Sequence, residues 1–188
     1  LMRIISGKFK GKSISFIKST ITRPLKDSVK ENIFNIINHS NLLSISLEKS
    51  NVLDLFSGIG SFGLECLSRG AGNVTFVEKD KSAIDVLNKN LLDLSIQKKA
   101  VVVSEKISNF LKKKQVKKFE IIFLDPPFVD NTYMDDLRMI SKNKIFKKEH
   151  VVIIHRETHS LDNLDEIIQS LIIKKYGRSK IVFGKFLS

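Results

Sequence analysis

The chain of 188 residues contains one cysteine, Cys66, no tryptophan and only three prolines. A single cysteine excludes an internal disulfide, and its place in an apolar helical pattern indicates a buried thiol rather than a nucleophile. No apolar run is long enough to span a membrane. Since 42% of the residues are hydrophobic, the chain can bury a sizeable core, and we expect one cytoplasmic domain with at most a small appendage.

Acidic residues are scarce beside basic ones, with 20 Asp and Glu against 32 Lys and Arg and a net charge of +12. The first 30 residues hold eight of the basic residues and a single acid, Asp27. This concentration favours a nucleic acid as partner, because phosphates are neutralised by clustered cations. The predicted phosphate contacts are Arg3, Lys8, Lys10, Lys12, Arg23 and Lys30.

The first part of the chain is predicted to be a basic β-hairpin followed by a linker. Two short strands, residues 3–6 and 12–16, flank Gly7 and Gly11. We assign residues 1–26 to this arm and residues 27–188 to the main domain. Asp27 is expected to cap a helix that continues to His39. Its predicted apolar face is Val29, Ile33, Phe34, Ile36 and Ile37.

From Asn51 the pattern alternates between strands and helices. Strands are predicted at 52–56, 74–77, 100–103, 119–124 and 151–155, and helices at 60–69, 81–94, 107–113 and 133–141. A further helix is expected at 161–170, followed by a closing hairpin of 171–176 and 180–186. This order predicts an α/β fold with a mostly parallel sheet covered by helices on both faces.

A glycine-rich segment follows the strand at 52–56. Gly58, Gly60 and Gly63 match G-x-G-x-x-G before a helix, and Glu78 ends the next strand, 20 residues after Gly58. Such a loop holds NAD or S-adenosylmethionine, with the acid on the ribose diol. Asp54 favours the methyl donor, because a carboxylate just before the glycines suits a ligand ammonium and not a pyrophosphate.

The segment Asp125-Pro126-Pro127-Phe128 follows the buried strand at 119–124. Prolines make this loop rigid, and together it offers a carboxylate, free carbonyls and an aromatic ring. Such a loop can hold a planar amine, whose two hydrogens are accepted while the ring stacks on the attached base. In the usual strand order this loop lies beside the strand that carries Asp54, so the amine would face the methyl donor.

These residues resemble the class I methyltransferase fold, and nearly the whole chain is similar to the RsmD family. The similarity rests on the basic opening at residues 3–12, Arg23-Pro24 with Lys30-Glu31 and Phe34, the segments 54–58, 63–65 and 67–71, Glu78, and Asp125 to Phe128. The resemblance implies a Rossmann-like seven-stranded sheet with a C-terminal antiparallel hairpin. It also implies transfer of a methyl group from S-adenosylmethionine to the 2-amino group of a guanine in small-subunit (16S) ribosomal RNA.

The resemblance assigns roles to particular positions. Amine presentation falls to Asp125, Pro126, Pro127 and Phe128. The cofactor-binding residues are Asp54, Phe56, Ser57, Gly58, Gly60, Glu78, Lys79, Lys106 and Ile107. Lys106 departs from the polar Asp or Asn that the family carries there, and a lysine cannot accept a hydrogen bond from the adenine amine. Glu105 or the backbone near Ile107 are the alternatives for that contact.

Other functions remain open from the residues alone. An adenine 6-amino methyltransferase on DNA or RNA would use the same loop, and a non-catalytic RNA-binding or assembly protein would keep the basic arm. An NAD-linked oxidoreductase would need a hydride-site constellation that the sequence lacks. No metal is expected, because His155 and His159 have no accompanying third ligand. The expected partner is ribosomal RNA or a partly assembled small subunit, bound by a monomer.

Overall fold

The computed structural model of the protein describes residues 2–18 and 25–187. A seven-stranded sheet has the order β5-β4-β3-β6-β7-β9-β8. Its parallel strands are β3 (Asn51–Leu55), β4 (Asn73–Glu78), β5 (Ala100–Ser104), β6 (Phe119–Leu124) and β7 (Phe146–Glu157). The antiparallel strands β9 (Ser179–Phe186) and β8 (Ile168–Tyr176) complete it. The α/β fold with a C-terminal antiparallel hairpin is therefore confirmed.

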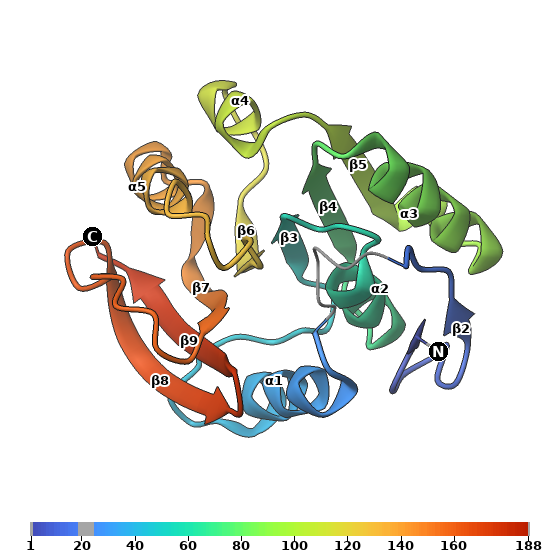
Figure 1. Ribbon diagram of the computed structural model, residues 1–188, viewed down its shortest axis with the longest axis horizontal. Coiled ribbons are helices and arrows are strands. Elements are labelled where there is room, and N and C mark those ends of the chain that lie inside the picture. Colours follow the sequence, from blue (N-terminus) through green and yellow to red (C-terminus); the bar gives the residue numbers. More distant parts are fainter. Residues whose placement is uncertain (1, 19–24, 188) are drawn as a thin grey trace.

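Helices cover both faces of this sheet (Figure 1). Helices α1 (Asp27–His39), α2 (Ser61–Ser68) and α3 (Lys81–Asp93) lie on one face, and α4 (Ile107–Lys112) and α5 (Tyr133–Asn143) on the other. The sheet separates two apolar clusters, and its strands alternate between them. In β6, Ile121 and Phe123 join the first cluster, whereas Ile122 and Leu124 join the second.

The N-terminal arm is packed onto the main domain. Its strands β1 (Met2–Arg3) and β2 (Ser13–Ile14) are shorter than predicted and pair antiparallel. Ile4 and Ile14 are 1% and 4% exposed and belong to the same apolar cluster as α1 and α2. The arm therefore shares a core with the domain that it precedes.

Two local predictions are wrong. Asp27 is the first residue of α1 and not its cap, because Lys26 holds the N-cap position without a side-chain hydrogen bond. The predicted helix at 161–170 is a loop that leads into β8. Only one turn forms there, with the N–H groups of Ile167 and Ile168 donating to the Leu164 carbonyl. The apolar spacing that suggested a helix belongs to this turn and to the start of the strand.

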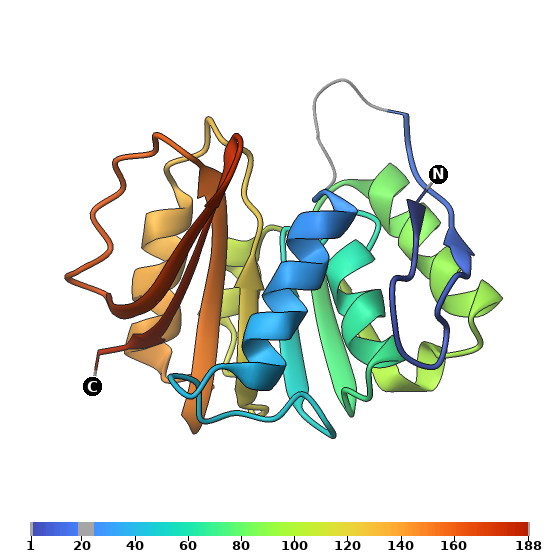
Figure 2. The same ribbon diagram turned by 90° about the horizontal axis from the view of Figure 1, so that it is seen from below.

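All five parallel strands end at one edge of the sheet. Figure 2 shows this edge at the top, together with the loop that follows β6 and the turn between β8 and β9. The chain crosses from β5 to β6 on the other side of β3, so the carboxyl ends of β3 and β6 lie side by side. This point, where the strand order reverses, is where open α/β sheets bind ligands.

Candidate active site

The carboxyl end of β3 carries a buried acid. Asp54 is 1% exposed, and its Oδ2 accepts a hydrogen bond of 3.0 Å from the Gly63 N–H in the first turn of α2. Burial raises the pKa of this carboxyl well above its usual range, against the lowering effect of the Gly63 N–H, and the charges of Asp125 and Glu78 raise it further. Among the described residues no cation lies within 4.0 Å of Asp54. The site is therefore suited to a positive group from a ligand.

The loop from β3 to α2 approaches its surroundings closely. Phe56 has a φ of 56°, in the left-handed region, and Gly60 has a φ of 87°. A Cβ on Gly60 would come within 2.4 Å of the Leu87 side chain, so only glycine fits there. At Gly58, by contrast, a Cβ would meet nothing within 4 Å. The loop is therefore packed closely against Leu87 at Gly60, whereas the space beside Gly58 is free.

Glu78, at the end of β4, fixes the shape of this loop. Its Oε2 accepts from the Gly58 N–H at 2.8 Å, and its Oε1 accepts from the N–H groups of Lys79 and Asp80. The Lys79 side chain itself points to solvent. A carboxylate has about four acceptor sites, so Glu78 retains capacity for a hydroxyl donor.

The Ser57 hydroxyl is buried and has no hydrogen-bond partner within the part of the chain that the structure describes. Buried hydroxyls are normally satisfied, so an orphan group needs an explanation. Together with the uncompensated carboxylate of Asp54, it means that this loop offers polar atoms that its own chain leaves unused. The residues present therefore fit a ligand with an ammonium, hydroxyls and a carboxylate, as S-adenosylmethionine has.

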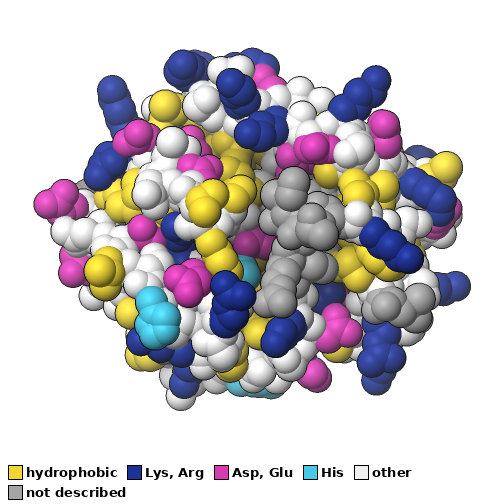
Figure 3. All heavy atoms as spheres, in the orientation of Figure 1, with side chains coloured by type: hydrophobic (Ala, Val, Ile, Leu, Met, Phe, Trp, Pro, Cys, Tyr) yellow, Lys and Arg dark blue, Asp and Glu magenta, His cyan; other side chains and the backbone are white. Residues whose placement is uncertain are grey.

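The Asp125-Pro126-Pro127-Phe128 loop meets the glycine loop at the adjacent strand end. The Asp125 N–H donates to the Leu55 carbonyl at 3.4 Å, and the charge of Asp125 contributes to the raised pKa of Asp54. Phe128 is 38% exposed. Figure 3 looks onto this edge, where acidic and histidine side chains lie at the bottom of a hollow near the centre. The two segments that the sequence singled out thus converge on one place.

Strand β7 supplies two contacts to this loop; the sequence allowed Arg156 to border the site but gave no sign of the contact from His155. His155 Nδ1 lies 2.7 Å from Asp125 Oδ1. Arg156, which is 2% exposed, donates from Nη1 to the Pro127 carbonyl and from Nη2 to the Phe128 carbonyl, both at 3.1 Å. The available signal was the place of both residues at the end of the strand that follows the loop. Because His155 and Arg156 are adjacent in β7, they can contact the loop at both ends, His155 at Asp125 and Arg156 at the Pro127 and Phe128 carbonyls.

Arg156 is itself held in place. Its Nε donates to Asp162 Oδ2 at 2.9 Å, and its guanidinium lies 4.5 Å from the centre of the Tyr133 ring. Tyr133 is fully buried, so it packs beneath the loop and does not line an open pocket. A planar guanidinium with five donors suits such a clamp, because it can serve a carboxylate and two carbonyls together.

The end of β5 lies farther along the same edge. Lys106 is exposed at the N-cap of α4, and the Ile107 side chain is buried beneath it. Both carboxylate oxygens of Glu105 accept from Lys113 Nζ at 2.8 Å. Of the two alternatives for an adenine contact, Glu105 therefore has one cation as partner and keeps a further acceptor site on each oxygen.

The predicted phosphate contacts fall into three groups. Arg3, Lys8, Lys10 and Lys12 are exposed on the arm, whereas Arg23 lies outside the described residues. Lys30 is 1% exposed, and its Nζ lies 3.1 Å from Ser61 Oγ and 3.8 Å from Glu65 Oε2. The prediction of a phosphate contact by Lys30 is thus wrong for this structure, because its ammonium has internal partners.

No cluster of three or more His, Cys, Asp or Glu side chains that could hold a metal ion is found within residues 2–18 and 25–187. Over the same ranges, no helix combines the length and the apolar character that crossing a membrane requires.

The fold is that of the class I methyltransferases. A solved structure from Escherichia coli, provisionally named a methyltransferase, has a TM-score of 0.85 and 27% identity over 98% of this chain and 97% of its own. A Haemophilus influenzae structure, provisionally named a methylase, has a TM-score of 0.78 and 30% identity over 99% and 98%.

A family model described as Conserved hypothetical protein 95 matches residues 2–185. The chain belongs to this family, and the resemblance to RsmD is confirmed. Relatives named Ribosomal RNA small subunit methyltransferase D include one from Buchnera aphidicola, 35% identical over 95% of this chain and 87% of the relative. The Escherichia coli protein of that name is 31% identical over 85% and 76%.

Proposed function

We propose that the protein transfers a methyl group from S-adenosylmethionine to the exocyclic 2-amino group of a guanine in small-subunit ribosomal RNA. Support comes from the family and from the names of its relatives. The observation that carries the proposal is the meeting of three carboxylates at adjacent strand ends. Asp54 and Glu78 contact the glycine loop, and Asp125 follows β6, the neighbour of β3 in the sheet.

The donor would be held by groups that the chain leaves unused. Asp54 would pair with the donor ammonium, and Glu78 would accept from one hydroxyl of the ribose. The Ser57 hydroxyl, which has no partner among the described residues, would hydrogen-bond to the same ligand. Glu105 or the backbone near Ile107 would make the adenine contact, and Phe56, Gly60, Lys79 and Lys106 would border the site. The bound donor supplies a methyl group on a sulfonium, which is a strong electrophile.

The chain's task is then to align a weak nucleophile. The lone pair of an aryl amine is delocalised into its ring, so it must be localised and aimed at the methyl group. We assign this to Asp125 and the Pro126 carbonyl, which would each accept one amine hydrogen. No hydrogen bond to the Pro126 carbonyl is found among the described residues, whereas that of Pro127 accepts from Asp130 and Arg156.

Phe128 would stack on the base that carries the amine. Its 38% exposure leaves the ring accessible at the edge of the site. Stacking of a base on an aromatic ring contributes about 1–3 kcal/mol. A base within a helix must be turned out of its stack at a cost of a few kcal/mol, which this contact and phosphate contacts would offset.

The exposed cations of the arm would supply those phosphate contacts. Arg3, Lys8, Lys10 and Lys12 reach solvent on a hairpin that packs against α2. We retain residues 1–26 as the RNA-contacting part and residues 27–188 as the methyltransferase part. A monomer that acts in the cytoplasm on ribosomal RNA or a partly assembled subunit completes the proposal.

The test is to map modified nucleotides in ribosomal RNA from cells that lack this protein and then to restore the modification in vitro. We expect one N2-methylguanosine to disappear from small-subunit RNA and to return with purified protein and labelled donor. Restoration of an N6-methyladenosine instead, or no difference between the two RNAs, would reject the proposed function.

A further inference from the structure

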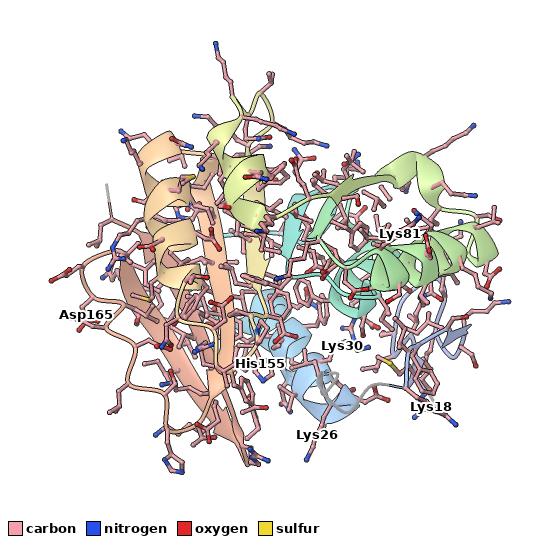
Figure 4. The ribbon with its side chains drawn as sticks, turned by 45° about the horizontal axis from the view of Figure 1, so that its top comes forward. Lys18, Lys26, Lys30, Lys81, His155 and Asp165 are labelled. Carbon is pink, nitrogen blue, oxygen red and sulfur yellow. The ribbon has the colours of Figure 1, made fainter. Side chains whose placement is uncertain are left out.

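His155 is a buried residue with both ring nitrogens engaged. It is 5% exposed at the carboxyl end of β7, and Figure 4 shows it toward the middle of the molecule. Its Nδ1 lies 2.7 Å from Asp125 Oδ1, and its Nε2 lies 2.9 Å from Ser179 Oγ at the start of β9. The phenyl ring of Phe128 stands edge-on to the imidazole, with ring centres 5.4 Å apart. The His155 side chain therefore contacts both Asp125 and Phe128, the two side chains that we assign to binding the guanine.

The chemistry of Asp125 and Ser179 determines which nitrogen of the His155 ring carries the hydrogen. An ionised carboxylate only accepts, so Nδ1 must carry the hydrogen that joins it to Asp125. In the neutral ring Nε2 is then an acceptor, and the Ser179 hydroxyl can donate to it. The imidazole is thereby held in one orientation.

The contact with His155 also makes the two oxygens of the Asp125 carboxylate different. Oδ1 is occupied by His155, whereas Oδ2 has no hydrogen bond among the described residues. The carboxylate cannot rotate without losing the short contact to Nδ1, so Oδ2 keeps a fixed direction. A fixed acceptor matters here, because a displacement of about 1 Å in a reacting geometry can cost 100-fold in rate.

We infer that His155 is a positioning residue, which orients Asp125 so that the base amine is aligned with the methyl donor. This inference rests on the proposed function and extends it to a residue outside the loop. Ser179 supports His155 from the far side. Since His155 contacts neither the glycine loop nor the arm among the described residues, its effect should be on turnover and not on binding.

The test compares His155→Ala, His155→Asn and His155→Gln. The amide nitrogen of Asn stands close to the place of Nδ1, whereas that of Gln reaches toward the place of Nε2. Steady-state methylation of small-subunit ribosomal RNA gives kcat and KM, calorimetry gives the affinity for S-adenosylhomocysteine, and urea unfolding shows which variants are folded. We expect kcat to fall roughly 10- to 100-fold for Ala and Gln, with KM and ligand affinity within about threefold of the unaltered protein.

The Asn variant should recover most of the lost kcat, because it still donates to Asp125. A residue that only fills space would be replaced better by Gln, which is closer in volume, so higher kcat with Gln than with Asn would overturn the inference. Unchanged kcat in His155→Ala would do the same. If the unaltered protein methylates no ribosomal RNA, the proposed function fails first and this inference fails with it.

Discussion

Two regions of the molecule contain a buried acid, and they treat it in opposite ways. Glu65 on α2 is fully buried and accepts from the N–H groups of Ile5 and Ser6, both at 2.9 Å, and from Arg69 Nε at 2.8 Å. Lys30 adds a second cation at 3.8 Å. Asp54, eleven residues earlier, accepts one backbone N–H and has no cation among its described neighbours.

This difference in partners distinguishes a structural role for Glu65 from a ligand-binding role for Asp54. Glu65 is compensated by its own chain, and its partners join the arm, α1 and α2 into one unit. Asp54 is left with a pKa raised by burial, which disfavours its charged form until a positive ligand arrives. A buried acid that the fold satisfies is a structural residue, whereas one that the fold leaves unpaired at a switch point is a binding residue.

The largest effect on stability is expected at the compensated acid. Glu65→Ala leaves Lys30 and Arg69 without their carboxylate and should lower the free energy of unfolding by about 3–5 kcal/mol. Urea unfolding measures this, with Glu31→Ala, an exposed residue of α1, as the control. A loss no larger than that of the control would contradict the structural role of Glu65.

The largest effect on activity is expected at the loop after β6. Asp125→Ala should abolish measurable methylation, because the amine loses its fixed acceptor. The affinity for S-adenosylhomocysteine should remain nearly intact, since Asp54 and Glu78 are unchanged. Radiolabelled methyl transfer and calorimetry on the same preparation give both values. Equal turnover in the variant would remove Asp125 from the mechanism.

Asp54→Asn should separate binding from stability. Donor affinity should fall at least about tenfold, or 1.4 kcal/mol, because the amide carries no charge for the ammonium. The free energy of unfolding should rise by about 0.5–2 kcal/mol at neutral pH, because a poorly solvated carboxylate has been removed. Unchanged donor affinity would end the assignment of Asp54 to the ammonium.

The stability gained in Asp54→Asn should depend on pH, and the raised pKa of Asp54 gives the direction. A raised pKa means that the folded protein holds its proton more tightly than the unfolded chain, so stability falls as pH rises above the ordinary value of 3.8. The advantage of Asp54→Asn over the unaltered protein should therefore be larger at pH 7.5 than at pH 4.5. Urea titrations at the two values test this.

Asp136 on α5 is the matched control for Asp54. Burial, with the charges of Asp130 and Asp135, raises its pKa to about 6, so its stabilising contribution is lost as pH rises from 3.8 to about 6. Asp136→Asn should also stabilise the protein at pH 7.5 but should leave donor affinity unchanged. An equal loss of donor affinity in both variants would show that the effect at Asp54 is not local.

The smallest effect per residue is expected on the arm. Replacing Lys8, Lys10 and Lys12 by Ala should reduce the slope of log affinity against log salt by about 2–3 for ribosomal RNA. The control replaces three exposed lysines of the α4 and α5 region, Lys114, Lys142 and Lys144. A similar decrease in both variants would mean that the arm has no special part in RNA binding.

The sequence predicted the succession of strands and helices and both loops, because these depend on local patterns. Alternating strands and helices, a glycine loop before α2 and an acid after β6 are each readable within a few residues. The turn at 164–168 was mistaken for a helix, because three apolar positions have the same spacing in both structures.

The contacts that sequence reasoning missed join residues far apart in the chain. The sequence predicted Lys30 as a surface cation, but the fold places its ammonium beside Glu65. Nothing in the residues around His155 indicates its contact with Asp125, which lies 30 residues earlier in the chain. Burial of a polar residue depends on a partner that only the tertiary structure identifies.

A structure of the protein with S-adenosylhomocysteine would test the central claim most directly. We predict the ligand ammonium at Asp54, its ribose at Glu78, and its sulfur directed toward Asp125 and Phe128. A ligand bound elsewhere, or one whose sulfur faces away from Asp125, would contradict the account.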